Sequence, residues 1–180
     1  TNSAAAAYQA QGFELGLHIT TDCGNWTSQS NLSDFYTNQL STFAGTFPGL
    51  TSPVTNRTHC IAWSDWATQP KVEYQNGIRY DTNYYYWPDQ WIQNRPGHFT
   101  GSGMPMRFAD LDGTMIDVYQ SPTQMTDESG IDYSLHINTL LNNALDSHGY
   151  YGVVTTNMHT DTGPHPGQQI VVNAALANGV

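Results

Sequence analysis

Helical and strand-like segments alternate along this chain of 180 residues, and the alternation restricts the folds that it can adopt. Hydrophobic periodicity and turn residues divide most of the sequence into four successive helix–strand pairs. These pairs lie at residues 1–12 and 13–18, 33–43 and 55–63, 64–75 and 78–82, and 135–145 and 151–159. Such an order is typical of a mainly parallel sheet with outer helices, in open or barrel form. The predicted fold class is therefore α/β.

Two further segments complete the predicted architecture. Residues 110–113 (D-L-D-G) separate alternating runs at 106–109 and 115–119, which predicts a β-hairpin. A last helix is expected at 167–177. The length favours one domain over residues 1–180.

Charge is the unusual feature of the composition. Only 11% of the residues are Asp, Glu, Lys or Arg, the net charge is −10, and Lys71 is the single lysine. So few cations cannot attract phosphate groups, which argues against nucleic acid and anionic membrane surfaces as partners. No apolar run approaches the roughly 18 residues of a membrane span. The abundant Asn, Thr, Ser, Gln and Tyr suit an uncharged, hydroxyl-rich ligand or an extracellular location.

Two cysteines, Cys23 and Cys60, each lie at or just beyond the end of a predicted strand that carries a histidine. They form one disulfide if those strands are neighbours and the compartment is oxidising, or else they are two buried thiols. Sequons begin at Asn25, Asn31 and Asn56. They permit glycosylation only if the source organism performs it.

Polar side chains recur where the predicted strands end, which is where parallel α/β folds form their sites. His18 and Asp22 are four residues apart, so one helical turn after the strand would bring both to one side and let them hold a divalent metal. The other groups are His59 with Asp65, Asp81 with Asn83, and His159 with Asp161, together with Arg107 and Asp110 from the hairpin region. Each alone is as easily a cap or a solvated side chain. Their recurrence predicts a functional site.

Aromatic side chains gather in the loops after two of these strands. They are Trp63, Trp66, Tyr84, Tyr85, Tyr86, Trp87 and Trp91. Their rings either stack on the apolar faces of sugars or pack within the protein, and about half are expected to do the latter.

Three segments carry a recognisable set of motifs. Residues 14–22 read E-L-G-L-H-I-T-T-D, residues 57–66 read R-T-H-C-I-A-W-S-D-W before G-I-R-Y-D-T-N at 77–83, and residues 155–161 read T-T-N-M-H-T-D. They resemble, in turn, the second motif, the third and fourth motif region, and the fifth motif of the polysaccharide deacetylase (NodB-homology) superfamily. The runs 59–86 and 101–120 also resemble deacetylase-like domains of large secreted bacterial proteins.

The chain departs from that family within the second motif and at both ends. His18 matches the first histidine of the motif, whereas Ile19 replaces its hydroxyl residue and Asp22 stands in the place of its second histidine. The first motif, a strand that ends in paired aspartates, is expected before Thr1, and the last barrel strand is expected after Val180. The resemblance thus implies a (β/α) barrel that is incomplete in this chain, with strand edges available for self-assembly.

The resemblance implies a secreted, metal-dependent hydrolase that removes acetyl groups from glycans, using zinc or a similar ion. The implied metal ligands are His18, Asp22 and His59, the catalytic residues are His159, Arg107 and Asp161, and the sugar contacts are Trp63, Trp66, Asp81, Tyr84, Tyr86 and Trp87. His159 would protonate the leaving amine, and Arg107 would orient a carboxylate. Catalysis is expected only if the aspartate motif lies upstream in the full protein.

Two other interpretations compete with this one. A non-catalytic extracellular domain, which binds glycans or assembles into a polymer, is consistent with the altered second motif and the low charge. A nucleotide-binding domain is disfavoured because no Gly-rich phosphate loop follows any predicted strand.

Overall fold

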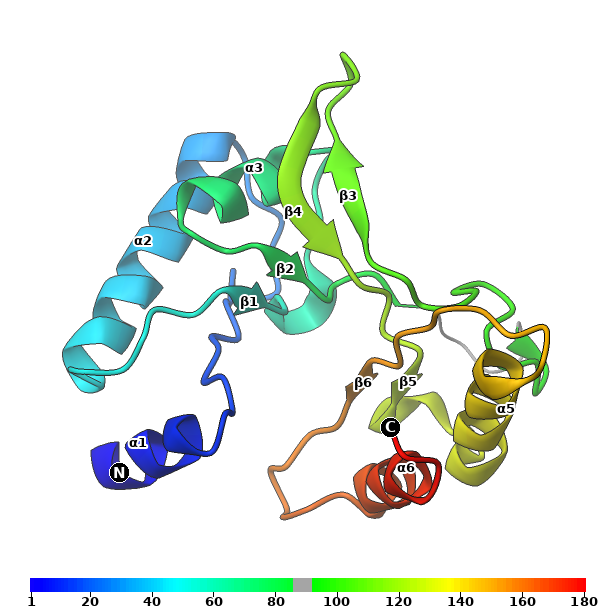
Figure 1. The fold of residues 1–180 in the computed structure, drawn as a ribbon. Helices are drawn as coiled ribbons and strands as arrows, with labels where there is room; N and C mark the ends of the chain where they lie inside the picture. Colours follow the sequence, from blue (N-terminus) through cyan, green and yellow to red (C-terminus); the bar gives the residue numbers. More distant parts are fainter. Residues whose placement is uncertain (86–91) are drawn as a thin grey trace. The chain divides into compact units, whose positions relative to one another are not determined.

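The computed structural model describes residues 1–85 and 92–180, which form two compact units (Figure 1). The first unit contains Thr1–Asn83 and Met106–Gln120, and the second contains Tyr84–Pro105 and Ser121–Val180. The chain therefore passes from one unit to the other three times. Both units combine helices with parallel strands, which confirms the α/β class, and their sheets are open, with four strands and two strands among the described residues.

The first unit is built on a sheet with the strand order β1-β2-β4-β3. The parallel strands are β1 (Thr55–Asn56), β2 (Tyr80–Asp81) and β4 (Met115–Gln120), and β3 (Met106–Ala109) pairs antiparallel with β4. Leu17 adds one parallel bridge to Asn56 beyond β1. The mainly parallel sheet is as predicted, and its antiparallel pair is the hairpin expected around the D-L-D-G turn.

Three helices accompany this sheet, namely α1 (Asn2–Ala10), α2 (Gln29–Thr46) and α3 (Thr68–Gln75). Each was predicted, with different bounds. The hydrophobic core of the unit takes Leu32 and Tyr36 from α2 and Val72 from α3. Gly77 follows α3 with a φ of 85°, in the left-handed region that a glycine adopts without strain, and it ends the helix as predicted.

The start of α2 differs from the prediction, which began the helix at residue 33. The cap is Ser28, whose hydroxyl accepts a hydrogen bond from the amide of Asn31 at 3.1 Å. The side chain of Asn31 in turn accepts from the amide of Thr27 at 3.2 Å. Because of these polar contacts, the helix begins at Gln29. The prediction used the hydrophobic pattern, which begins later, and therefore placed the start too late.

The strand predicted at 55–63 ends at Asn56. Beyond it, Cys60 and Ile61 take left-handed backbone angles, with φ of 58° and 52°, in a short 3-10 turn at His59–Ile61. An extended strand cannot continue through such angles. The prediction of a long second strand was therefore wrong.

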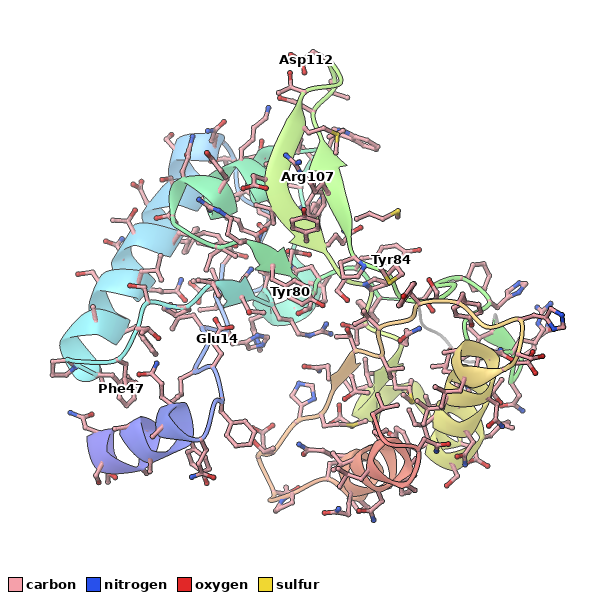
Figure 2. All side chains as sticks on the ribbon, viewed as in Figure 1. Glu14, Phe47, Tyr80, Tyr84, Arg107 and Asp112 are labelled. Atoms are coloured by element: carbon pink, nitrogen blue, oxygen red, sulfur yellow. A yellow bond between two sulfur atoms is a disulfide. The ribbon has the colours of Figure 1, made fainter. Side chains whose placement is uncertain are left out.

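The strand predicted at 13–18 is reduced to the bridge at Leu17. Before it, the carboxylate of Glu14 accepts hydrogen bonds from the amides of Val54 and Thr55 at 2.7 and 2.8 Å. A side chain thus takes the place of the backbone ladder that a full strand would form (Glu14 is labelled in Figure 2).

The second unit contains a parallel pair of short strands, β5 (Met125–Thr126) and β6 (Thr156–Asn157), and the helices α5 (Tyr133–Leu145) and α6 (Pro166–Ala177). Its core cluster comprises Ile92, Met125, Ile131, Ile137, Leu140 and Leu141. Both helices confirm the predictions. Among the described residues of the whole chain, no helix has the length and hydrophobicity needed to cross a membrane.

The strand predicted at 151–159 is formed only as β6. Ahead of it, the amide of Val153 donates to the carbonyl oxygen of Ser102 at 2.9 Å, which is a loop contact. The amide of Gln124 donates to the carbonyl oxygen of Thr155 at 2.9 Å. The hydrophobic residues of this segment therefore contact loops and helices on each side rather than two neighbouring strands.

Candidate functional site

The imidazoles of His18 and His59 meet at the carboxyl ends of parallel segments. His18 follows Leu17, which bridges to β1, and His59 follows β1 by three residues. His59 Nδ1 lies 3.1 Å from His18 Nε2, and both residues are exposed. The structure thus brings together two of the three predicted metal ligands.

Backbone contacts hold the ring of His18 and the main chain of His59. His18 Nδ1 lies 2.7 Å from the carbonyl oxygen of Arg57, and because a carbonyl only accepts hydrogen bonds, this nitrogen carries the ring proton. The lone pair of the neutral ring is then on Nε2, the nitrogen that faces His59. The amide of His59 donates to the carbonyl oxygen of Ile19 at 2.7 Å, which ties the two segments together.

The two nitrogens are spaced as ligands of one metal ion. A Zn–N bond of about 2.0–2.1 Å places two ligands at tetrahedral or octahedral angles about 2.8–3.4 Å apart. The separation of His18 Nε2 and His59 Nδ1, 3.1 Å, falls within this range. Ligating histidines usually donate their other ring N–H to a carbonyl or carboxylate, as His18 does to Arg57. The pair therefore fits a divalent ion as two of its ligands.

Asp22 does not complete this pair as the spacing had suggested. Residues 19–21 form no helical turn, and Asp22 has a left-handed φ of 56°. In the part of the chain that the structure describes, two groups of three ligand side chains have their donor atoms within 4.8 Å of one another, Cys23–His59–Cys60 and Asp127–Glu128–His159. Asp22 belongs to neither group.

Cys23 and Cys60 form a disulfide, with their Cα atoms 5.3 Å apart. It joins the loop after His18 to the turn that contains His59. Of the two alternatives that the sequence left open, the structure has the disulfide.

A histidine–carboxylate pair lies at the carboxyl ends of the two strands of the second unit. Asp127 follows β5 directly, and His159 follows β6 by two residues. His159 Nδ1 lies 2.9 and 3.0 Å from the two carboxylate oxygens of Asp127, and the His159 amide donates to the same carboxylate at 3.1 Å. The predicted catalytic histidine thus has a partner that the sequence analysis missed.

The two members of this pair shift each other's pKa. The hydrogen bond to Asp127 raises the pKa of His159 above its ordinary value against partial burial, and the charges of Asp127, Glu128 and Asp161 add to the rise. Burial raises the pKa of Asp127, but its hydrogen bonds from His159 outweigh burial and hold the pKa below its ordinary value. His159 is therefore protonated over a wider pH range than a free histidine.

The first unit also contains a fully buried polar cluster that was not predicted. Glu73 Oε1 accepts hydrogen bonds from the hydroxyl of Tyr36 at 3.1 Å, from Asn56 Nδ2 at 2.9 Å and from Gln69 Nε2 at 3.0 Å. Asn56 is only 1% exposed, so glycosylation of its sequon is incompatible with this fold. Tyr36 and Asn56 lie 37 and 17 residues from Glu73 in the sequence, so no local pattern indicates such a cluster.

Asp81, which was expected to contact a sugar, belongs to this cluster. It is fully buried, and its carboxylate accepts hydrogen bonds from the backbone and the side chain of Asn83. Burial raises the pKa of both Glu73 and Asp81, and the charge of Asp81 raises that of Glu73 further. Hydrogen bonds from Glu73 and Asn83 stabilise the ionised form of Asp81, so the proton of the pair resides on Glu73.

The predicted sugar-contacting aromatics have different environments. Trp63 stacks on Phe108 with ring centroids 5.8 Å apart and packs against the core. Trp66 is 64% exposed, although its indole N–H donates to the carbonyl oxygen of Ala109. Tyr84 is also exposed (Figure 2). The predictions for Tyr86 and Trp87 lie outside the described residues.

Two other predicted site residues have local partners. Arg107, on β3, lies with its Nε 3.7 Å from a carboxylate oxygen of Asp117 on β4 (Figure 2). Asp65 accepts a hydrogen bond from the amide of Thr68 at 2.8 Å, at the first residue of α3. Both contacts are those expected of side chains that stabilise a strand pair or a helix end.

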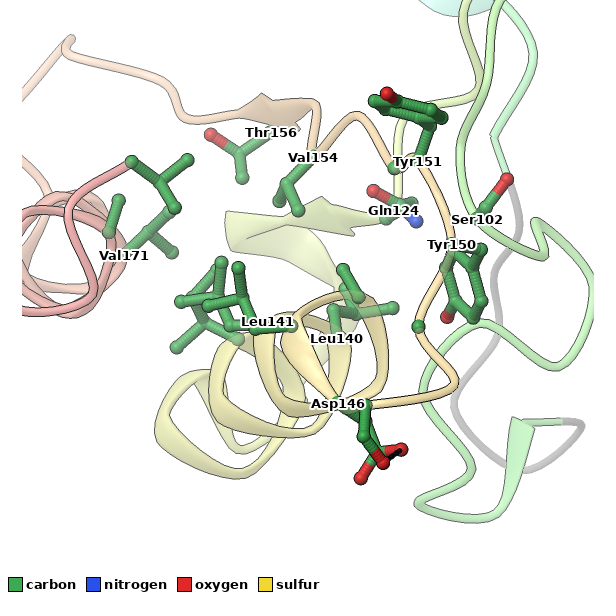
Figure 3. Close-up of a pocket in the computed structure, with 18 residues that line it drawn as sticks. Ser102, Gln124, Leu140, Leu141, Asp146, Tyr150, Tyr151, Val154, Thr156 and Val171 are labelled. Atoms are coloured by element: carbon green, nitrogen blue, oxygen red, sulfur yellow. Dashed lines mark hydrogen bonds between the residues drawn. The ribbon is translucent and has the colours of Figure 1, made fainter.

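The second unit has a cavity of about 660 Å³ (Figure 3). Leu140 and Leu141 of α5 and Val171 of α6 line it, with Tyr150 and Tyr151 from the segment ahead of β6. The lining is mainly apolar, and none of the site residues predicted from the sequence is part of it.

No family model and no curated protein matches the chain. Among solved structures, the chain is similar to one from Bordetella bronchiseptica that is described as a "putative polysaccharide deacetylase involved in o-antigen biosynthesis". The sequences are 19% identical, the match covers 82% of this chain, and the TM-score is 0.43. This chain spans 50% of the length of that one.

Proposed function

We propose that this chain is the deacetylase-like part of a secreted, metal-dependent hydrolase that removes acetyl groups from the amide nitrogens of a glycan. The observation that carries the proposal is the His18–His59 pair, with its 3.1 Å spacing and with the second ring nitrogen of His18 held by a backbone carbonyl. Both features are those of metal-ligating imidazoles. The open sheet of the first unit would be part of a barrel-like sheet.

Each residue has a chemical role under this proposal. His18 and His59 would hold the ion, and a bound zinc or similar ion would supply Lewis-acid polarisation of the acetamide carbonyl. The resemblance assigns His159 the proton transfer to the departing amine, and Asp127 would keep that imidazole protonated and oriented. Because Nδ1 of His159 faces Asp127, the proton that it donates is on Nε2. No residue of this chain corresponds to the aspartate base of the family's first motif, and we assign no base.

Exposed rings support a glycan as the substrate. Trp66 and Tyr84 present aromatic surface to solvent, and such surface binds the apolar faces of sugars. The net charge of −10 favours an uncharged N-acetylated sugar over an anionic one. The Cys23–Cys60 disulfide supports an extracellular location.

The direct test combines metal content with acetate release from N-acetylglucosamine oligomers. We expect the zinc-loaded protein, tested in a form that includes the upstream aspartate motif, to release acetate, and His18→Ala and His59→Ala to lose both bound metal and activity. His159→Ala should retain the metal and lose at least a hundredfold in rate, as removal of a general acid does. His148→Ala is the matched control, because that side chain is 95% exposed and outside the site.

Other outcomes would contradict the proposal. Metal content that does not change in His18→Ala and His59→Ala would exclude the pair as ligands. A metal-loaded chain that binds N-acetylglucosamine oligomers without releasing acetate would favour the second candidate, a non-catalytic glycan-binding domain. The exposed ring of Trp66 is the observation that supports this second candidate.

A further inference from the structure

The disulfide lies against the imidazole pair. The sulfur atoms of Cys23 and Cys60 and a ring nitrogen of His59 all lie within 4.8 Å of one another, and all three residues are exposed. His18 Nε2 lies 3.1 Å from His59 Nδ1. Two sulfurs and the imidazole of His59 are therefore gathered in one exposed place on the first unit, with His18 beside His59, and the three grouped donors form a Cys₂His set that leaves a fourth position for water.

Contacts other than the S–S bond hold these donors in place. The hydroxyl of Thr21 donates to the carbonyl oxygen of Gly24 at 2.7 Å, and the amide of Gly24 donates back to Thr21 at 3.0 Å, which closes the turn that contains Cys23. On the other side, the amide of Ile61 donates to the carbonyl oxygen of Thr58 at 3.1 Å across Cys60. Cleavage of the disulfide would thus leave two thiols that still face each other.

The loop that carries Cys23 is also fixed from α2. Gln39 accepts a hydrogen bond from the amide of Thr20 at 3.0 Å and donates to its carbonyl oxygen at 2.8 Å. The amide of His59 donates to the carbonyl oxygen of Ile19, one residue earlier. These contacts connect both cysteine-bearing turns to the core through Ile19, which is buried.

We infer that the reduced chain binds a zinc ion through the thiolates of Cys23 and Cys60 and the imidazole of His59, and that the disulfide closes this site. In tetrahedral zinc sites, Zn–S bonds of about 2.3 Å and Zn–N bonds of about 2.0–2.1 Å place neighbouring donors about 3.3–3.8 Å apart. Donor atoms that already lie within 4.8 Å of one another need to move by only about 1 Å. The oxidised chain keeps the two imidazoles alone.

Reduction of the Cys23–Cys60 disulfide to two thiols is a two-electron step. A dithiol reductant attacks the disulfide, the Cys23–Cys60 bond breaks, the reductant becomes a disulfide, and two thiols are formed. Zinc then replaces the two thiol protons, which are released to solvent. The affinity for a soft ion consequently depends on the redox state of the surroundings, whereas the imidazole pair is present in both states.

Cobalt(II) is the probe for the test, because thiolate coordination gives it a charge-transfer absorption that imidazole ligands do not give. The chain is reduced with dithiothreitol, freed of reductant under nitrogen and titrated with cobalt, beside a sample left oxidised. We expect one cobalt per reduced chain with the thiolate band, a dissociation constant at least tenfold below that of the oxidised chain, and displacement of cobalt by zinc. Cys23→Ser and Cys60→Ser should lose most of the band, and His59→Ala should weaken binding at least tenfold.

The control variant is again His148→Ala, which should match the wild-type chain. Because a serine variant can fold poorly, reduced wild-type chain alkylated with iodoacetamide provides a second way to remove the thiolates, and it should show no band. Equal cobalt affinity in the reduced and oxidised chains, or a reduced chain without the thiolate band, would overturn the inference.

The outcome can be separated from that of the proposed function, on which it rests only in sharing His59. If acetate release fails while the thiolate band appears on reduction, the inference stands and the proposed function does not. If the Cys23→Ser, Cys60→Ser double variant releases acetate with zinc while no band appears in the reduced wild-type chain, the proposed function stands and the inference does not.

Discussion

The carboxylate of Asp127 sets the protonation state of His159. The hydrogen bond between them raises the pKa of the imidazole, so the folded chain binds a proton more tightly than the unfolded chain. The stabilisation from this pair is complete below the unfolded pKa of about 6.5 and is lost as the pH rises through the raised folded pKa.

We expect Asp127→Asn to lower the pKa of His159 toward about 6.5, because an amide does not stabilise the imidazolium. An NMR titration of the His159 ring proton measures this directly, and the alkaline limb of any acetate-release profile should move to lower pH with it. Glu128→Gln is the control, since its charge is a lesser cause of the shift. Equal shifts in the two variants would contradict the assignment of Asp127 as the main partner.

The second prediction concerns how the buried, protonated carboxyl group of Glu73 affects the pH dependence of stability. Because burial raises its folded pKa, the stabilisation is complete below the unfolded pKa of about 4.3. It is lost as the pH rises toward the folded value, by up to about 1.4 kcal/mol for each pH unit. Glu73→Gln keeps the acceptor for Tyr36 and supplies an N–H in place of the carboxyl proton. We expect this variant to be more stable than the wild type at pH 8 and less dependent on pH.

Urea unfolding at pH 5, 6.5 and 8 measures the effect, with the exposed Glu128→Gln as the reference variant. A Glu73→Gln chain that is destabilised equally at all three pH values would show that Glu73 is ionised in the folded chain.

Residues at strand ends could be predicted, and buried polar residues could not. His18, His59 and His159 stand beside strands in the sequence, so the general rule for parallel sheets located them. The Glu73 cluster depends on contacts between α2, β1, α3 and β2, and its members look like ordinary polar residues within their own segments. Asp81 was predicted to contact a sugar, but in the structure it is fully buried.

At the scale of elements, α2 depends on its polar start. We expect Ser28→Ala to lower the free energy of unfolding by about 1 kcal/mol, because the amide of Asn31 loses its acceptor. Ser33→Ala is the matched control, since Ser33 lies inside the helix and its replacement by a better helix former should cost little. Urea unfolding compares the two variants, and a larger loss for Ser33→Ala would place the cap where the hydrophobic pattern had suggested.

Helices were predicted better than strands, for a physical reason. A helix such as α5 satisfies its own backbone and needs several turns of periodic residues, so its sequence carries a long signal. The strands β1, β2, β5 and β6 have two residues each, too few for a period to be recognised. Their lengths are set by partners, such as Glu14, that replace the backbone ladder from distant parts of the chain.

At the scale of the whole molecule, the disulfide closes a loop across residues that are 37 apart in sequence. We expect its removal in the Cys23→Ser, Cys60→Ser double variant to lower the free energy of unfolding by about 2–4 kcal/mol, because the unfolded chain gains freedom. Dithiothreitol should lower the unfolding midpoint of the wild type to the same extent and leave the double variant unchanged. A wild-type chain unaffected by the reductant would contradict the expectation.

The strand order β1-β2-β4-β3 also determines how much of the chain must be synthesised before the first unit can fold. β4 occupies the place between β2 and β3 but is completed only at Gln120, after the Tyr84–Pro105 part of the second unit has been made. At about 5–20 residues per second, the 39 residues from Asp81 to Gln120 take roughly 2–8 seconds. During that interval β2 has one side without its partner. A nascent chain of this kind has a defined period in which a chaperone, or a neighbouring nascent chain, can compete for that edge.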